Sequence, residues 1–212
     1  MKPTFMILLG SLFLTPFAQG QPVSIGVKGG VPLTDAFETA SGNGSAFFTH
    51  TKRYTVGPTI EFHLPARFSI EFDALYSRVG FDSTTTSGPI PSTSNTRANS
   101  WQFPILGKFE ILPGPIRPFI DAGVSIRNIS GVVHSVANAA GITSSSGTSP
   151  EFHKSTDTGF TFGAGIAFKA GSVRVSPEFR YVRWGGETFR DPINSLLRTN
   201  RNDGTFLLGF TF

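Results

Sequence analysis

Hydrophobic and polar residues alternate along eight segments of the chain. In the last of them, Phe206, Leu208, Phe210 and Phe212 alternate with Thr205, Leu207, Gly209 and Thr211. A period of two indicates a β-strand, because successive side chains point to opposite faces. Most segments have ~9–11 residues or slightly more, the length that a tilted strand needs to cross a bilayer. The predicted strands are 23–31, 54–64, 68–81, 101–112, 117–127, 159–169, 173–184 and 205–212.

The two faces of these strands differ in a way that favours a membrane barrel. One face is bulky, apolar and almost free of charge, whereas the other carries glycine, small hydroxyl residues and charges. Membrane barrels turn their apolar face to lipid and their polar face inward. Six basic and six acidic residues are therefore predicted to form a charge network inside a narrow lumen, where charges must pair. They are Lys28, Lys108, Arg127, Lys169, Arg174, Arg180, Glu61, Glu71, Asp73, Glu110, Asp121 and Glu178.

The predicted hairpins also set which charges lie opposite each other. Lys108 is expected opposite Asp121, a favourable pair. Lys169 should face Arg174, and Glu61 should face Glu71, which are like-charge pairs. Like charges directly opposite are destabilising. We therefore expect neighbours from other strands to compensate both pairs within one interior network.

The links between strands alternate between short and long. Short turns are predicted at 65–67, 113–116 and Gly171-Ser172, the last a two-residue hairpin that needs positive φ at its first position. Long links fall at 33–53, 82–99, 128–158 and 185–204. Outer-membrane barrels have short periplasmic turns and long extracellular loops, so both termini should be periplasmic. The Ser/Thr-rich stretches Asp82–Ser100 and Gly141–Ser149 are expected to be hydrated loops, although an adhesive role is an alternative.

The first twenty residues predict a secretory signal peptide. Lys2 precedes the apolar run 5–17, and Ala18-Gln19-Gly20 supplies small residues before a cleavage site at Gln21. The run is shorter than the ~20 residues of a spanning helix, although an N-terminal anchor is the alternative. The domain organisation predicted is thus a signal peptide at 1–20 and one barrel domain at 21–212.

Composition agrees with an all-β fold. The chain holds 24 glycines and 22 phenylalanines, which disfavour helices and favour strands respectively, and no cysteine. No cluster of Lys and Arg is dense enough to indicate nucleic-acid binding. Five aromatic residues lie toward the long-loop ends of their strands, where an interfacial girdle is expected: Tyr54, Tyr76, Trp101, Tyr181 and Trp184.

With these features the chain resembles the small eight-stranded outer-membrane barrels, the family that includes the OmpA transmembrane domain, OmpX and OmpW. The resemblance rests on the opening segment 23–30, the glycine-interrupted strand 159–168 and the terminal Gly209-Phe-Thr-Phe212. It implies an up-and-down antiparallel β-barrel in the outer membrane. Phe210 and Phe212 resemble the signal that the outer-membrane insertion machinery recognises. The resemblance ends at the barrel, so the peptidoglycan-binding domain of OmpA is not expected.

No catalytic, cofactor or metal site is predicted. Enzymes with this fold exist, and they need a nucleophile or an acid–base set near the outer leaflet. The histidines are His50, His134 and His153 in long links and His63 near a short turn, without the spacing of metal ligands. Adjacent His134 and Ser135 point in opposite directions on an extended chain, which is poor geometry for a base and its nucleophile.

The resulting hypothesis is an integral outer-membrane barrel with a plugged polar lumen and a structural or surface-interaction role through its extracellular loops. Expected partners are membrane lipid, lipopolysaccharide and the insertion machinery, while any extracellular ligand stays unidentified. Two alternatives remain at this point. One is a channel for small solutes, and the other is a soluble exported barrel that binds a ligand inside.

Overall fold

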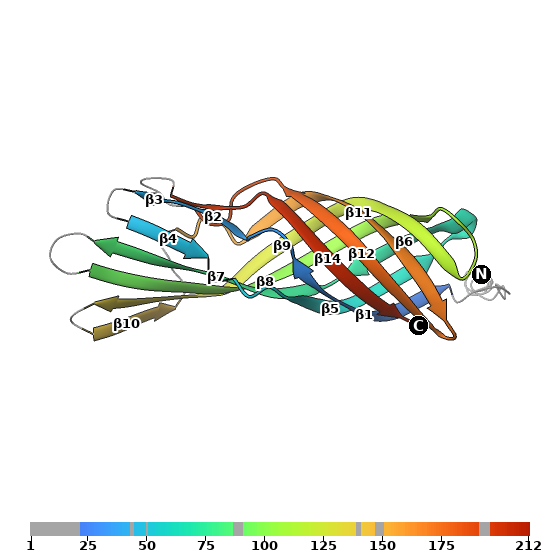
Figure 1. The fold of residues 1–212 in the computed structure, drawn as a ribbon, viewed down its shortest axis with the longest axis horizontal. Coiled ribbons are helices and arrows are strands. Elements are labelled where there is room, and N and C mark those ends of the chain that lie inside the picture. The colour runs from blue at the N-terminus through green and yellow to red at the C-terminus, as the bar shows by residue number, and fades with distance from the viewer. Residues whose placement is uncertain are drawn as a thin grey trace, which may run out of the picture.

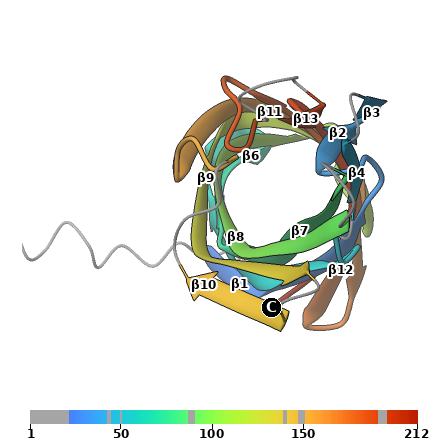
Figure 2. The same ribbon diagram turned by 90° about the vertical axis from the view of Figure 1, so that its left-hand side faces the viewer.

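Eight antiparallel strands close on themselves into a barrel (Figures 1 and 2). The computed structural model describes residues 22–42, 45–49, 51–86, 91–138, 141–146, 151–190 and 196–212, so the predicted signal peptide lies outside the described residues. Within these ranges the chain forms no helix capable of crossing a membrane. The barrel strands are β1 (Val23–Pro32), β5 (Thr55–His63), β6 (Phe68–Asp73) continued by β7 (Leu75–Thr86), β8 (Pro91–Glu110), β9 (Ile116–Asn138), β11 (Thr156–Ala170), β12 (Val173–Trp184) and β14 (Asn202–Thr211).

The last strand closes the ring between the first and the seventh. β14 pairs with β12, where Val175 lies opposite Phe210. On its other side β14 pairs with β1 from Gly26 opposite Thr211, and Ile25 and Phe212 exchange backbone hydrogen bonds of 3.1 and 3.0 Å. On its other edge β1 pairs with β5, where Val23 lies opposite Phe62. A closed ring leaves no unpaired edge in the barrel wall.

Short turns join the strands at the end that holds both ends of the described chain (Figure 1). A 3₁₀ turn at Pro65–Arg67 joins β5 to β6, with Ala66 at φ 61°. Gly171 and Ser172 alone connect β11 to β12, and Gly171 has φ 67°. The prediction of a two-residue hairpin with positive φ at its first position is confirmed.

The opposite end, called here the long-loop end, differs from the prediction. Segments expected to be loops form strands that continue the barrel wall: β7 runs to Thr86 and β8 begins at Pro91, and these two pair throughout. β9 continues to Asn138 and pairs with β10 (Gly141–Ser146). The expectation of loops at 82–86, 91–100 and 141–146 is wrong, while 87–90 and 147–149 lie outside the described residues. Serine- and threonine-rich sequence extends here because threonine favours strands and the barrel strands set the register.

The remaining long links also carry short strands. β2 (Phe37–Thr39), β3 (Ser41–Gly42) and β4 (Ser45–Thr49) lie between β1 and β5, and β13 (Leu197–Thr199) precedes β14. β4 pairs with β7 beyond the barrel, whereas β13 pairs with β2. Two links far apart in sequence are thus joined over the long-loop end.

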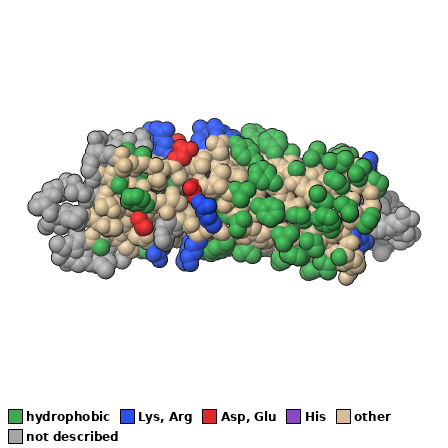
Figure 3. All heavy atoms as spheres, viewed as in Figure 1, with side chains coloured by type: hydrophobic (Ala, Val, Ile, Leu, Met, Phe, Trp, Pro, Cys, Tyr) green, Lys and Arg blue, Asp and Glu red, His purple; other side chains and the backbone are tan. Residues whose placement is uncertain are grey.

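The outer surface near the termini is a continuous apolar belt (Figure 3). Its side chains come from every barrel strand and are exposed, among them Val27, Val56, Ile70, Phe103, Ile120, Phe162, Phe179 and Phe206. Aromatic rings follow at its long-loop border, where Tyr76 lies 5.2 Å from Trp101 and 6.4 Å from Tyr54 between ring centroids. An apolar exterior excludes a soluble barrel, because large exposed apolar patches do not persist in water.

The interior of the long-loop end holds an apolar cluster that the alternation did not predict. Rings from two links and from β7 meet there, with Phe37 5.3 Å from Phe81 and 5.6 Å from Phe189 between centroids. The buried members of this apolar cluster are Phe37, Phe47, Phe81, Ala98, Ile129, Val132, Phe189 and Leu197. The links therefore fold over the barrel and are anchored by packing.

Candidate functional site

The predicted lumen charges lie almost entirely inside the barrel, because they share the inward face of their strands. Ten of the twelve side chains are buried: Lys28, Glu61, Glu71, Asp73, Lys108, Glu110, Asp121, Arg127, Glu178 and Arg180. Arg174 is half-buried with 17% of its side chain exposed. Lys169 is exposed at the short-turn end, beside the hairpin, and lies outside this group.

Ion pairs among side chains from four strands meet at Glu71. This carboxylate contacts the amine of Lys28, Lys108 Nζ at 3.1 Å and Arg180 Nη2 at 2.9 Å. Arg180 also binds Asp73 at 2.7 Å and Glu178 at 2.6 Å. Lys28 approaches Glu178 at 2.8 Å from the opposite side. Each guanidinium or amine thus has more than one carboxylate, as charges removed from water require.

The like-charge pair of Glu61 and Glu71 is bridged by a base from a third strand. The two residues lie opposite each other in the register, and Lys108 Nζ lies 3.3 Å from Glu61 and 3.1 Å from Glu71. Lys108 also lies opposite Asp121 as expected, but its amine turns to the two glutamates. Its Nζ sits 4.1 Å from the centroid of the Phe119 ring, a favourable cation–π contact.

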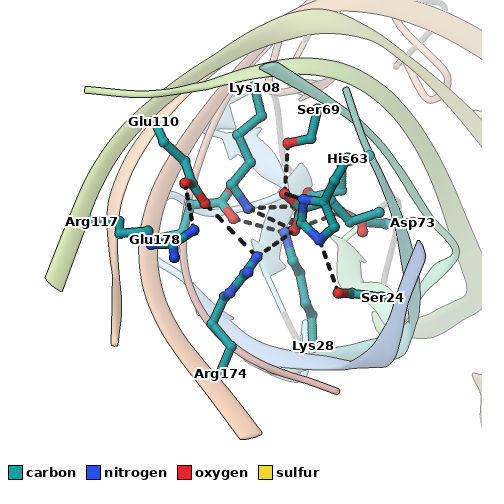
Figure 4. Close-up of polar contacts among 12 residues, drawn as sticks. Ser24, Lys28, His63, Ser69, Asp73, Lys108, Glu110, Arg117, Arg174 and Glu178 are labelled. Carbon is teal, nitrogen blue, oxygen red and sulfur yellow. Dashed lines mark hydrogen bonds and ion pairs between the residues drawn. The ribbon is translucent and has the colours of Figure 1, made fainter. Parts of the chain in front are cut away.

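Arg174 connects the remaining acids to the same group. Its Nη1 lies 3.7 Å from Glu61 and 3.8 Å from Glu110. Figure 4 shows these side chains converging on the lumen centre from different strands. We call this group the ion-pair cluster; its members are Lys28, Glu61, Glu71, Asp73, Lys108, Glu110, Arg174, Glu178 and Arg180.

Several residues that support the cluster were not predicted. Arg117 Nη1 donates to Glu110 at 2.9 Å, and Ser69 Oγ donates to Glu61 at 2.6 Å. His63 lies 3.6 Å from Glu61 and hydrogen-bonds Ser24 at 2.9 Å through its other ring nitrogen. Arg117 shares the inward parity of Asp121, so the alternation already contained the signal for it. His63 marks the boundary of the cluster at the short-turn end.

Small residues make room for the cluster on β11. A Cβ at Gly163 would lie 2.4 Å from an Asp121 carboxylate oxygen, and one at Gly165 would lie 2.5 Å from the Phe119 ring. These glycines therefore admit large inward side chains from β9. Asp121 stands apart from the cluster, since its buried Oδ1 has no hydrogen-bond partner among the described residues.

Arg127 lies nearer the long-loop end and has a separate environment. Its Nη2 is 3.4 Å from Asp157, and its guanidinium carbon is 4.2 Å from the Trp184 ring centroid. Trp184 is fully buried. Its expected place in the outer aromatic girdle is therefore wrong, because Trp184 has the inward parity of Arg180, whereas Tyr181 has the outward parity of the exposed Phe179.

A cavity of about 60 Å³ separates the ion-pair cluster from the apolar cluster. It is lined by Arg180 of the ion-pair cluster, by Phe37 and Phe189 of the apolar cluster, and by Arg127. Its rim includes the exposed Lys52 and Arg53. The cavity therefore communicates with solvent at the long-loop end.

The histidines form no metal site in the part of the chain that the structure describes. His134 belongs to β9 rather than a loop, and its Nδ1 hydrogen-bonds Thr96 at 2.9 Å. His50 lies outside the described residues. Phe210 and Phe212 are exposed on the outer face of β14 and just after it. Their role as an insertion signal stays a prediction.

Comparisons with known proteins agree with this geometry. A family model described as "Outer membrane protein beta-barrel domain" matches residues 17–185. No curated protein sequence matches the chain. Among solved structures, the outer membrane protein OprG from Pseudomonas aeruginosa aligns with a TM-score of 0.53 at 11% identity, covering 89% of this chain and 92% of OprG. Neisserial surface protein A aligns with a TM-score of 0.42 at 10% identity, covering 91% and 98%. The likeness to OprG supports the fold.

Proposed function

This chain belongs to the outer membrane protein β-barrel domain family, and from that premise we propose that it is a closed barrel with a role at the cell surface rather than a channel. The observation that carries the proposal is the ion-pair cluster. Its side chains reach across the lumen from opposite strands, and its central carboxylate is shared by three cations. A lumen of eight strands has room for side chains and little else.

The cost of opening this lumen supports a closed state. Separating buried charges leaves each without its partner, at a cost of several kcal/mol per ion. Glu71, Lys28 and Arg180 are each 3% exposed or less. Because every one of them has two or more partners, movement of a single side chain does not clear the path.

The surface role is proposed for the long-loop end, which we assign to the extracellular side. Short turns on the periplasmic side and long connections outside are the rule for outer-membrane barrels. Here the long connections form paired strands above an internal apolar cluster. This packing supports a stable platform for contact with other molecules.

Planar-bilayer recordings test the closed state. We expect the purified barrel to give no steady openings above a protein-free detergent control. The double variant Glu61→Ser, Lys108→Ser removes one acid and one base, so the net charge of the lumen does not change. Glu71 keeps Lys28 and Arg180 as partners, so the barrel should still fold. Because two large side chains are lost from the lumen, the variant should conduct. Its matched control, Asp35→Ser with Arg53→Ser, removes an exposed ion pair at the rim and should stay closed. Steady openings of the unmodified barrel would favour a small-solute channel and overturn the proposal.

A further inference from the structure

Arg127 is a buried cation whose hydrogen-bonding capacity is only partly used. The residue is 7% exposed, and its Nε has no hydrogen-bond partner among the described residues. Its ion pair with Asp157 is long at 3.4 Å, and Asp203, which lines the same cavity, attracts the guanidinium without a hydrogen bond to it among the described residues. For comparison, Arg180 binds its carboxylates at 2.6–2.9 Å. The two acids offset part of the cost of burying the guanidinium, but its Nε–H donor is left for a further acceptor.

Asp157 cannot compensate Arg127 fully, because it serves other donors. Its Oδ1 accepts from Lys154 at 2.8 Å, and its Oδ2 accepts from the backbone N–H of Gly186 at 3.2 Å. Arg127 therefore shares an oxygen that already has a partner. The Trp184 ring at 4.2 Å holds the guanidinium plane from another direction.

The same cavity exposes a second unpartnered group. Thr188 is 1% exposed and its Oγ1 makes no hydrogen bond in the described part of the chain. Both Thr188 and Arg127 line the cavity. Buried polar groups without partners are rare in folded proteins. Two such groups on one cavity leave hydrogen-bonding capacity that a bound molecule can use.

The other residues that line the cavity indicate the chemistry of the rest of the bound molecule. Leu75, Val182 and Leu207 are buried apolar side chains on the cavity wall, and the apolar cluster lies on the far side. About 60 Å³ corresponds to roughly four to six water molecules at ~10–15 Å³ each. A ligand of comparable size has a charged end and a short apolar end.

We propose that this cavity binds a small organic carboxylate, with Arg127 as the anion-binding residue. The planar guanidinium matches a carboxylate through two parallel hydrogen bonds. Thr188 Oγ1 would donate a third, and the short aliphatic part would contact Leu75 and Val182. The basic side chain of Lys52 at the rim favours entry of an anion, whereas Arg53 beside it is already paired with Asp35. Binding does not require passage through the ion-pair cluster, so it is independent of whether the barrel conducts.

Trp184 provides the means to test the proposal. The chain has two tryptophans, so Trp101→Phe leaves only the one that stacks on Arg127. In that background we expect sodium butyrate to change Trp184 fluorescence saturably, whereas butyramide and sodium chloride at equal ionic strength should not. Arg127→Gln should weaken binding at least tenfold. Thr188→Val and Arg127→Lys, which keeps the charge but loses the fork, should weaken it several-fold.

The control is Arg78→Gln, which removes an exposed arginine of β7 outside the cavity and should bind like the Trp101→Phe parent. Altered migration of unheated samples shows which variants fold. If Arg127→Gln does not fold, Arg127→Lys and Thr188→Val decide. No response to butyrate, an equal response to butyramide, or unchanged affinity in the folded Arg127 and Thr188 variants would overturn the site. Binding of inorganic phosphate in place of butyrate would overturn the carboxylate assignment.

Discussion

At the scale of single residues, the interior depends on how charges are shared rather than on how they are matched in pairs. Glu71 faces Glu61 across a hairpin, an arrangement that is unfavourable for an isolated hairpin. Three cations from β1, β8 and β12 reverse this. Glu71 is therefore the residue whose loss would leave the most positive charge in the lumen without a partner.

Glu71→Ala is accordingly expected to destabilise the barrel by ~3–5 kcal/mol, the usual cost of removing one partner from a buried ion pair. The matched change Asp35→Ala, which breaks an exposed pair with Arg53, should cost less than ~1 kcal/mol. Urea unfolding in lipid vesicles, followed by fluorescence, measures both. Equal shifts for the two variants would show that the lumen charges contribute no more than surface pairs.

The inward residues could be predicted from alternation, but their partners could not. The alternation of inward and outward positions identified ten buried charged residues. It did not identify their partners: Lys108 lies opposite Asp121 in the register but forms its ion pairs with Glu61 and Glu71. Closure of the sheet brings strands that are distant in sequence within reach of one side chain. The partial isolation of Arg127 has the same origin, because it depends on where Asp157 and Trp184 lie in the closed ring.

At the scale of elements, the strands crossing the belt were predictable within a few residues, and β12 matches its predicted bounds. The signal was strong there because one face meets lipid and the other meets charges. Beyond the belt the outward residues face water and are polar as well, so outward and inward positions no longer differ clearly in hydrophobicity. The extensions of β7, β8 and β9 therefore went unpredicted, although their serine and threonine content is compatible with strands.

The hairpin between β11 and β12 gives a prediction at this scale. Gly171 has φ 67° and no atom within 4 Å of an added Cβ, so Gly171→Ala introduces backbone strain without a clash. We expect a loss of ~1–2 kcal/mol in the free energy of unfolding. Gly107→Ala is the control, since that glycine has ordinary φ and its Cβ would meet only a carbonyl oxygen at 3.8 Å. A loss of the same size in both variants would contradict the backbone explanation.

At the scale of the whole molecule, the barrel interior has two parts with different chemistry. The ion-pair cluster is formed by buried charges of the strands that carry the apolar belt, and the apolar cluster lies at the long-loop end. The long-loop end thus holds a small hydrophobic core of its own. Such a region can open locally while the rest of the barrel stays folded.

Phe81→Ala tests this division. Phe81 is 1% exposed within the apolar cluster, and truncation of a buried phenylalanine costs ~3–5 kcal/mol. In intact cells an external protease should cut the long-loop end faster than in the unmodified protein, while the belt strands stay protected and unheated samples keep their folded migration. Phe48→Ala, at an outward ring that is 59% exposed, should behave like the unmodified protein. Unchanged cleavage of Phe81→Ala would contradict a separate core, and cleavage at the short turns would contradict the orientation.

The sequence by itself determined the class of fold, the strands that cross the belt, the face that meets lipid and the parity of the interior charges. These follow from a period of two and from the opposite demands of hydrocarbon and a polar lumen, which act residue by residue. Only the tertiary structure decided the sharing of Glu71 among three strands, the inward place of Trp184 beside Arg127 and the apolar cluster over the cavity. Those features depend on the closure of the ring and on contacts between links far apart in sequence, and no local pattern records such contacts.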